Sequence, residues 1–200
     1  MPPQKSSESI AKFIAGLYPK QVTVSVSANE FLANFKNGEY SPVFGEITCK
    51  GGETLFEHVD HHNRSKTPLT LVDLGSGVGR FCIHAALTRK FTSIFGIELS
   101  PSRHLIACKA LEKFSDAEHV KFHNMNLLDF PLPITPLVVY CASLTFSTEM
   151  ITAIEKKIKS ECQSNCLIYT CRELKHLKKI DEIFVDTSWS PKATLHVYET

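Results

Sequence analysis

The sequence lacks the features that mark membrane-spanning, secreted or strongly basic proteins. No apolar run reaches the ~20 residues that a membrane span requires, and the N-terminal residues MPPQKSSES contain no apolar block of the signal-peptide kind. The 22 basic and 21 acidic residues leave a formal charge of +1. Net charge therefore gives no support to nucleic-acid or nucleosome binding, and we expect an intracellular protein, cytoplasmic or nuclear, with no membrane partner.

Cysteine pairs at zinc-finger spacing are absent as well. The seven cysteines are scattered, odd in number and mostly inside apolar runs, a pattern typical of reduced core residues in an intracellular compartment. His58, His61 and His62 could bind a metal, but the group would need further ligands from elsewhere in the chain. A solvated helix end is the simpler interpretation, so we expect no metal.

Length and composition favour one domain with a lead-in segment. Two hundred residues, 43% of them hydrophobic, suffice for one sizeable core. Residues 1–40 are predicted to form a helical or flexible lead-in, because their start is polar and the stretches 9–18 and 30–35 space apolar residues as helices do. Residues 41–200 form the expected domain. Whether the lead-in packs on the domain or covers a ligand is left open.

The chain is organised around residues 69–98, where two apolar runs flank a glycine turn and a helical pattern. The turn carries Gly75, Gly77 and Gly79 directly after a β-rich run over 69–74. Glycine adopts backbone angles closed to other residues and lets a ligand lie against the main chain at a helix N-terminus. We predict a β-α-β unit that binds a nucleotide-like cofactor; a glycine turn without a ligand is the alternative.

The acid before this turn helps to separate two classes of cofactor. Asp73 would repel the pyrophosphate of a dinucleotide, whereas it would attract the ammonium and sulfonium of S-adenosylmethionine. In the dinucleotide pattern G-x-G-x-x-G the third glycine would fall at Arg80. Glu98 stands where both classes place an acid for the ribose hydroxyls. The pattern favours S-adenosylmethionine over a dinucleotide.

A second informative loop covers residues 41–48. It holds Phe44 and Glu46 on either side of a glycine. An aromatic face and a carboxylate both stabilise a cationic ligand, so this loop could lie over a sulfonium. On the loop alone, an ordinary turn with a solvated glutamate is the better interpretation.

Two expected strand tips supply further candidates. Asn126 and Leu127 follow a short strand predicted over 119–123, where an amide could meet the adenine amino group and an apolar side chain could pack on the ring. Asn126 could equally be a turn residue. The apolar run over 137–141 predicts a buried parallel strand, and the segment after it leads to Phe146.

The remaining pattern completes an α/β domain. Helices are expected over 101–114 and 148–159, and strands over 166–170, 182–187 and 193–198. The last two strands follow each other without a helix, which implies an antiparallel pair. We predict a doubly wound, seven-stranded, mostly parallel sheet with a C-terminal antiparallel hairpin, a Rossmann-like fold.

With these motifs, the chain resembles class I S-adenosylmethionine-dependent methyltransferases, and among them the disruptor-of-telomeric-silencing family of histone lysine methyltransferases. The likeness covers residues 41–200 and rests on V-F-G-E over 43–46, similar to that family's V-Y-G-E, and on D-L-G-S-G-V-G-R over 73–80. Carried over by position, and with Leu127 added, it implies a cofactor site made of Phe44, Glu46, Thr48, Asp73, Gly75, Ser76, Gly77, Gly79, Glu98, Asn126 and Leu127. Asn126 replaces the family's adenine-binding aspartate, and its oxygen can still accept a hydrogen bond.

The tip after residue 141 departs from that family. Where the family has an asparagine followed by aromatics, this chain has C-A-S-L-T-F over 141–146, which keeps Phe146 and loses the amide. The family's basic nucleosome-binding extension has no counterpart in the sequence. The resemblance therefore implies methyl transfer to a protein lysine more securely than to a histone, with S-adenosyl-L-homocysteine as the second product.

The expected mechanism is in-line displacement by a neutral amine, which mainly requires alignment and exclusion of water. Glu46, which could orient donor or nucleophile, and Phe146, which could form a channel wall, are the catalytic candidates. An RNA or small-molecule methyltransferase and a cofactor-binding regulatory module without turnover are the alternatives. The chain lacks the N-P-P-Y or D-P-P-Y signature of many enzymes that methylate amino groups of nucleic acids.

Overall fold

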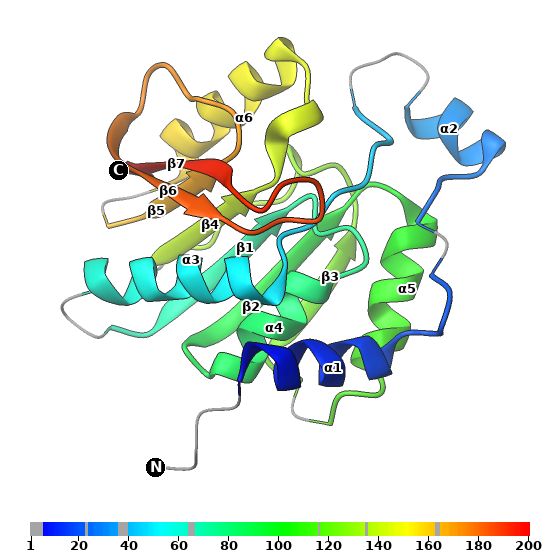
Figure 1. The fold of residues 1–200 in the computed structure, drawn as a ribbon. Coiled ribbons are helices and arrows are strands. Elements are labelled where there is room, and N and C mark those ends of the chain that lie inside the picture. The colour runs from blue at the N-terminus through cyan, green and yellow to red at the C-terminus, as the bar shows by residue number, and fades with distance from the viewer. Residues whose placement is uncertain are drawn as a thin grey trace.

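The computed structural model describes residues 6–22, 24–35, 40–63, 67–115, 117–134, 136–162 and 165–200, which build a seven-stranded sheet in the order β3-β2-β1-β4-β5-β7-β6 (Figure 1). The strands are β1 (Leu69–Leu74), β2 (Phe91–Glu98), β3 (Val120–Asn124), β4 (Leu137–Cys141), β5 (Leu167–Thr170), β6 (Lys178–Val185) and β7 (Ala193–Glu199). Strands β1 to β5 are parallel, and β7 pairs antiparallel with β5 and β6. This confirms the predicted Rossmann-like sheet with its C-terminal hairpin.

The helices begin at residues that satisfy their free backbone amides. They are α1 (Ser7–Leu17), α2 (Ala28–Asn34), α3 (Cys49–His62), α4 (Arg80–Thr88), α5 (Pro101–Leu111) and α6 (Thr148–Glu161), with a 3-10 turn, η1 (Ser143–Thr145). A hydroxyl accepts a first-turn amide at Ser6, Ser27, Thr48, Ser100 and Ser147. Helix α4 is the exception: its N-cap, Gly79, lies in the left-handed region and has no capping side chain, because the helix follows directly from the glycine turn.

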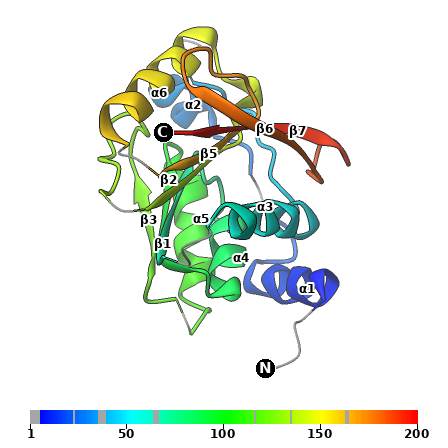
Figure 2. The same cartoon turned by 90° about the vertical axis from the view of Figure 1, so that its left-hand side faces the viewer.

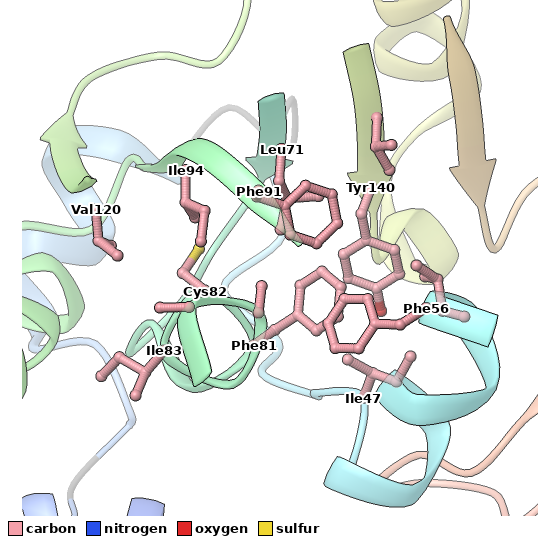
Figure 3. Close-up of a cluster of buried hydrophobic side chains, with 14 of the residues drawn as sticks. Ile47, Phe56, Leu71, Phe81, Cys82, Ile83, Phe91, Ile94, Val120 and Tyr140 are labelled. Atoms are coloured by element: carbon pink, nitrogen blue, oxygen red, sulfur yellow. The ribbon is translucent and has the colours of Figure 1, made fainter. Parts of the chain in front are cut away.

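The two faces of the sheet carry separate cores. Helices α3, α4 and α5 lie on one face, with α1 packed against α3 and α4 (Figure 2). The aromatic centre of this core is Phe56, which stacks on Phe81 at 5.4 Å between ring centroids (Figure 3). On the other face, α6 and the segment 127–132 cover a second apolar cluster. The central strands β1, β4 and β5 are therefore buried along their whole length, as their apolar runs require.

The lead-in segment packs on the domain through α1. Ile14 and Leu17 of this helix are buried in the core, and the Tyr18 hydroxyl donates a 2.8 Å hydrogen bond to the Val78 carbonyl in the glycine turn. Helix α2 contributes no buried residue. Among the described residues, no helix combines the length and hydrophobicity that crossing a bilayer would need.

Candidate active site

A cavity of about 230 Å³ lies at the carboxyl ends of the central parallel strands. Most of its lining comes from five segments: the glycine turn after β1, the end of β2, residues 40–47, the tip after β4, and the loop between β6 and β7. Ligands of open α/β sheets bind at this edge, because the crossover connections leave a crevice there. The cavity therefore lies where the sequence predicts a cofactor.

The structure brings most of the predicted site residues together in this cavity. Those that line it are Phe44, Glu46, Asp73, Gly75, Ser76, Gly77, Glu98, Leu127 and Phe146. They come from segments up to 102 positions apart in the chain (residues 44 to 146). The predicted residues Thr48, Gly79 and Asn126 do not contribute to the lining.

Each of these three residues is the chain neighbour of a residue that lines the cavity. Thr48 caps α3 and donates a 2.6 Å hydrogen bond to the Asp186 carboxylate. A Cβ at Gly79 would lie 2.4 Å from the ring of Phe122, so this position accepts only glycine without rearrangement. Asn126 donates a 2.8 Å hydrogen bond to the Tyr40 hydroxyl, and Tyr40 itself lines the cavity.

The glycine turn is held in a fixed shape against β2. The amides of Gly75 and Ser76 both donate to the Ile97 carbonyl at 2.9 Å. Gly75 and Gly77 have φ angles of 95° and 56°, which disfavour any residue with a side chain. A Cβ at Gly77 would also lie 2.7 Å from the Phe44 ring. The turn can therefore bring a ligand and the Phe44 ring close to the main chain.

Asp73 is a buried carboxylate that has no oppositely charged partner in the part of the chain that the structure describes. It is 2% exposed, its Oδ1 has no hydrogen-bond partner among the described residues, and its Oδ2 has only the Cys82 thiol at 3.6 Å. Burial raises the pKa of Asp73 to about 7, and the charge of Glu98 adds to the rise. A cationic ligand would supply the missing compensation, so the site fits the ammonium of S-adenosylmethionine.

Glu98 ends β2 and is buried like Asp73, but it has partners. Its carboxylate accepts 2.8 Å hydrogen bonds from the amides of Gly77 and Ser100. Burial raises the pKa of Glu98, while these amides and the nearby Arg103 oppose the rise. Because each carboxylate oxygen has two lone pairs, Glu98 keeps capacity for ribose hydroxyls.

Glu46 forms an ion pair with Arg80 at 2.5 Å, and both side chains are about one quarter exposed (26% and 27%). The Arg80 guanidinium also lies over the Tyr18 ring, 4.6 Å from its centroid. Burial raises the pKa of Glu46, and Arg80 counteracts this. The pair leaves Glu46 available as a hydrogen-bond acceptor at the cavity wall but not as an isolated base.

Arg103 connects the lead-in to the loop over residues 41–48. It is 4% exposed, and its Nε donates to the Val24 carbonyl at 2.8 Å, while Nη2 donates to the Pro42 carbonyl. Its guanidinium lies 5.3 Å from the centroid of the Phe44 ring. Sequence reasoning missed this residue, because its partners are 61 and 79 positions away and neither is marked by its residue type.

The outer wall of the cavity is apolar. Trp189, between β6 and β7, packs on Gly45, where a Cβ would lie 2.6 Å from its ring. Val43 and Leu144 are more than half exposed at the rim, and Trp189 is partly exposed. Sequence reasoning missed Trp189; its available signal was that it is the single tryptophan, placed in a polar S-W-S-P turn.

The histidine group lies away from the cavity. His61 and His62 are exposed, as the solvated-helix interpretation predicts, but that interpretation is wrong for His58. His58 hydrogen-bonds the Tyr169 hydroxyl at 2.8 Å and pairs with Asp181 at 3.2 Å, and so connects α3 to β5 and β6. Within the described ranges, no group of histidine, cysteine or acidic side chains is arranged to hold a metal ion.

Comparison with known protein families shows to which family the chain belongs. Residues 21–197 match the sequence model of a family described as histone methylation protein DOT1. The chain belongs to the DOT1 family. DOT1-family membership and a cavity that fits the donor agree, so the protein is an S-adenosylmethionine-dependent methyltransferase. A comparison of the sequence with curated proteins gave no match.

Solved methyltransferase structures share the fold of this DOT1-family chain. An RNA methyltransferase from Salinibacter ruber, in complex with S-adenosyl-L-homocysteine, matches with a TM-score of 0.59 and 18% identity over 74% of this chain and 90% of that chain. Magnesium protoporphyrin IX methyltransferase from Synechocystis PCC 6803, with bound S-adenosylmethionine, matches with a TM-score of 0.57 and 12% identity over 100% of both chains. At such identities the likeness establishes the fold, not the acceptor.

Proposed function

We propose that the protein transfers a methyl group from S-adenosylmethionine to the side-chain amine of a lysine in a protein substrate. Membership in a family described as histone methylation proteins supports a lysine acceptor. The observation that carries the proposal is the rim of the cavity, where Val43, Leu144 and Trp189 present apolar surface beside Phe146. A lysine has a long apolar stem that such a rim can contact.

The donor would be held by the polar side of the cavity. Asp73 would bind the ammonium, Glu98 the ribose hydroxyls and Leu127 the adenine ring, with Phe44 packed over the glycine turn. When bound, S-adenosylmethionine supplies a methyl group on a positively charged sulfur, from which the lysine nitrogen displaces S-adenosyl-L-homocysteine. The protein's own contribution is to fix the two reactants in line and to exclude water.

The acceptor must arrive as a neutral amine. A lysine side chain that enters an apolar channel loses its proton more easily, since burial disfavours the ammonium. Phe146 and Trp189 would form the walls of that channel, and Glu46, held by Arg80, would orient the reactants by accepting hydrogen bonds. No separate general base is required, because the proton can leave to water before the amine is enclosed.

The test is a labelling experiment with radioactive S-adenosylmethionine. Free core histones, nucleosomes and fractionated lysate are offered in parallel, and labelled proteins are digested and analysed by mass spectrometry. We expect methyl-lysine in a protein fraction, and much less label with the Asp73→Asn variant. Label in RNA or in small molecules, or binding of S-adenosyl-L-homocysteine without any transfer, would contradict the proposal.

A further inference from the structure

Three buried oxygens without partners meet in one place. Among the described residues, the buried side-chain oxygen atoms that lack a hydrogen bond are Asp73 Oδ1, Ser76 Oγ and the Tyr140 hydroxyl. All three residues line the candidate cofactor cavity. Buried polar atoms normally find partners inside the protein, so a group of unsatisfied atoms around one cavity points to a polar ligand.

Tyr140 is placed beside Asp73 by the register of the sheet. The two residues are direct partners across the parallel strands β1 and β4, so their side chains project to the same face. The Tyr140 ring is fixed in the aromatic core, 4.6 Å from the centroid of Phe81 (Figure 3). Burial keeps the phenol protonated by raising its pKa far above the usual range, and the nearby Cys171 and Asp73 add to this. The hydroxyl therefore remains a donor in a fixed position.

Free donors are few on this side of the cavity: among the described residues, the Ser76 and Tyr140 hydroxyls are the buried O–H groups of the lining that lack a partner. The amides of Gly75, Ser76, Gly77 and Gly79 already donate to protein acceptors. Arg80 is paired with Glu46. The amino-acid end of S-adenosylmethionine carries a carboxylate as well as an ammonium, and an ionised Asp73 can accept hydrogen bonds but not donate them.

We propose that the Tyr140 hydroxyl hydrogen-bonds the amino-acid end of the methyl donor, next to Asp73. The proposal rests on donor binding in this cavity, but not on the identity of the acceptor. A phenylalanine would fill the same space in the core without burying an unsatisfied hydroxyl. The unpaired hydroxyl therefore lowers the stability of the free protein, and a hydrogen bond to the ligand would offset this loss.

The test compares two ligands on the Tyr140→Phe variant by calorimetry. S-adenosyl-L-homocysteine contains the amino-acid end, whereas 5′-methylthioadenosine lacks it and keeps the nucleoside. We expect the dissociation constant of S-adenosyl-L-homocysteine to rise about tenfold, and that of 5′-methylthioadenosine to stay unchanged. The melting temperature of the free variant should equal or exceed that of the wild type, which separates this role from a folding defect.

Tyr198→Phe is the matched control. The Tyr198 ring is also fully buried, but its hydroxyl accepts the Leu174 amide at 2.7 Å and does not line the cavity. Its removal should lower the melting temperature and leave both ligand affinities unchanged. An unchanged affinity of Tyr140→Phe for S-adenosyl-L-homocysteine, or an equal loss for both ligands, overturns the proposal. Neither measurement uses an acceptor, so a failed lysine assignment would not be confused with a failed Tyr140 assignment.

Discussion

The two walls of the cavity differ in chemistry and in exposure. The wall to which we assign the methyl donor, called the donor wall, is formed by the glycine turn and the ends of β1 and β2 and consists of buried polar groups such as Asp73 and Glu98. The wall to which we assign the acceptor, called the acceptor wall, is formed by the tip after β4 and the β6–β7 loop and presents Leu144 and Trp189 to solvent. A buried polar wall specifies one ligand closely, because each unmatched group costs free energy. An exposed apolar wall accepts many partners of similar shape.

The largest effect should come from Asp73→Asn. Removing the charge that compensates the ammonium should weaken S-adenosyl-L-homocysteine binding about a hundredfold, or about 3 kcal/mol. Because the folded protein holds this group with a raised pKa, ionisation costs stability as the pH rises from 3.8 to about 7. The variant should therefore be about 2–4 kcal/mol more stable than the wild type at pH 8, and not at pH 4.

Calorimetry and thermal melting of the free protein check both parts of this prediction. Asp60→Asn is the control, since Asp60 is an exposed residue of α3 that pairs with Lys90 outside the cavity. If Asp73→Asn lowered the affinity for S-adenosyl-L-homocysteine less than threefold, Asp73 would not be the charge that binds the ammonium.

Gly77→Ala should damage the donor wall through geometry. Alanine would be strained at a φ of 56°, and its Cβ would lie 2.7 Å from the Phe44 ring. We expect about 1–3 kcal/mol of lost stability and about tenfold weaker donor binding, measured by melting and calorimetry. Gly16→Ala is the control, because a Cβ there meets nothing within 4 Å in α1; this change should stabilise the helix slightly. If both variants kept the stability and donor affinity of the wild type, the Phe44 ring would not lie as close to Gly77 as the structure shows.

Donor affinity should depend on pH through Asp73. Its pKa of about 7 in the free protein means that most of the carboxyl is protonated at pH 6 and ionised at pH 8. Since the ammonium requires the ionised form, affinity for S-adenosyl-L-homocysteine should fall about tenfold from pH 8 to pH 6. Titration calorimetry at several pH values measures this, with 5′-methylthioadenosine as the control because it has no ammonium. A flat profile would mean that Asp73 does not face the ammonium.

The acceptor wall should respond more weakly. Trp189→Ala should raise the KM for a protein acceptor about fivefold, or about 1 kcal/mol, with S-adenosyl-L-homocysteine affinity unchanged. Phe184→Ala removes another exposed aromatic, which contacts Lys192 and lies outside the cavity, and should change neither quantity. Steady-state kinetics with the identified substrate separates the walls. An equal loss of donor affinity in Trp189→Ala would show that the two walls are not independent.

The bounds of the buried central strands could be predicted from the sequence, whereas those of the edge strand β6 could not. Strands β1 and β4 span the residues that the apolar runs indicate, because a strand covered on both faces is mostly apolar. Strand β6 was predicted over 182–187 but spans Lys178–Val185. It lies at the edge of the sheet, where its charged, exposed residues hide the strand pattern.

The same division applies to the site. Asp73 and the turn glycines all lie within residues 73–79, so their chemistry could be recognised locally. Tyr140 and Trp189 join the cavity only through the strand order and a distant loop, which a single sequence does not reveal. Asn126 was assigned by position, and its two neighbours could not be foreseen: its amide nitrogen donates to Tyr40, from 86 positions earlier, and its oxygen accepts the Leu128 amide.

The hydrogen bonds of Glu98 link the candidate cofactor site to helix α2. This carboxylate accepts the Ser100 amide, and the Ser100 hydroxyl in turn contacts Glu30 of α2, a helix without buried residues. Binding of a nucleoside to Glu98 would therefore also affect α2, which has no buried residue to stabilise it. Hydrogen–deuterium exchange should slow in α2 more than in the well-packed α4 when the nucleoside binds.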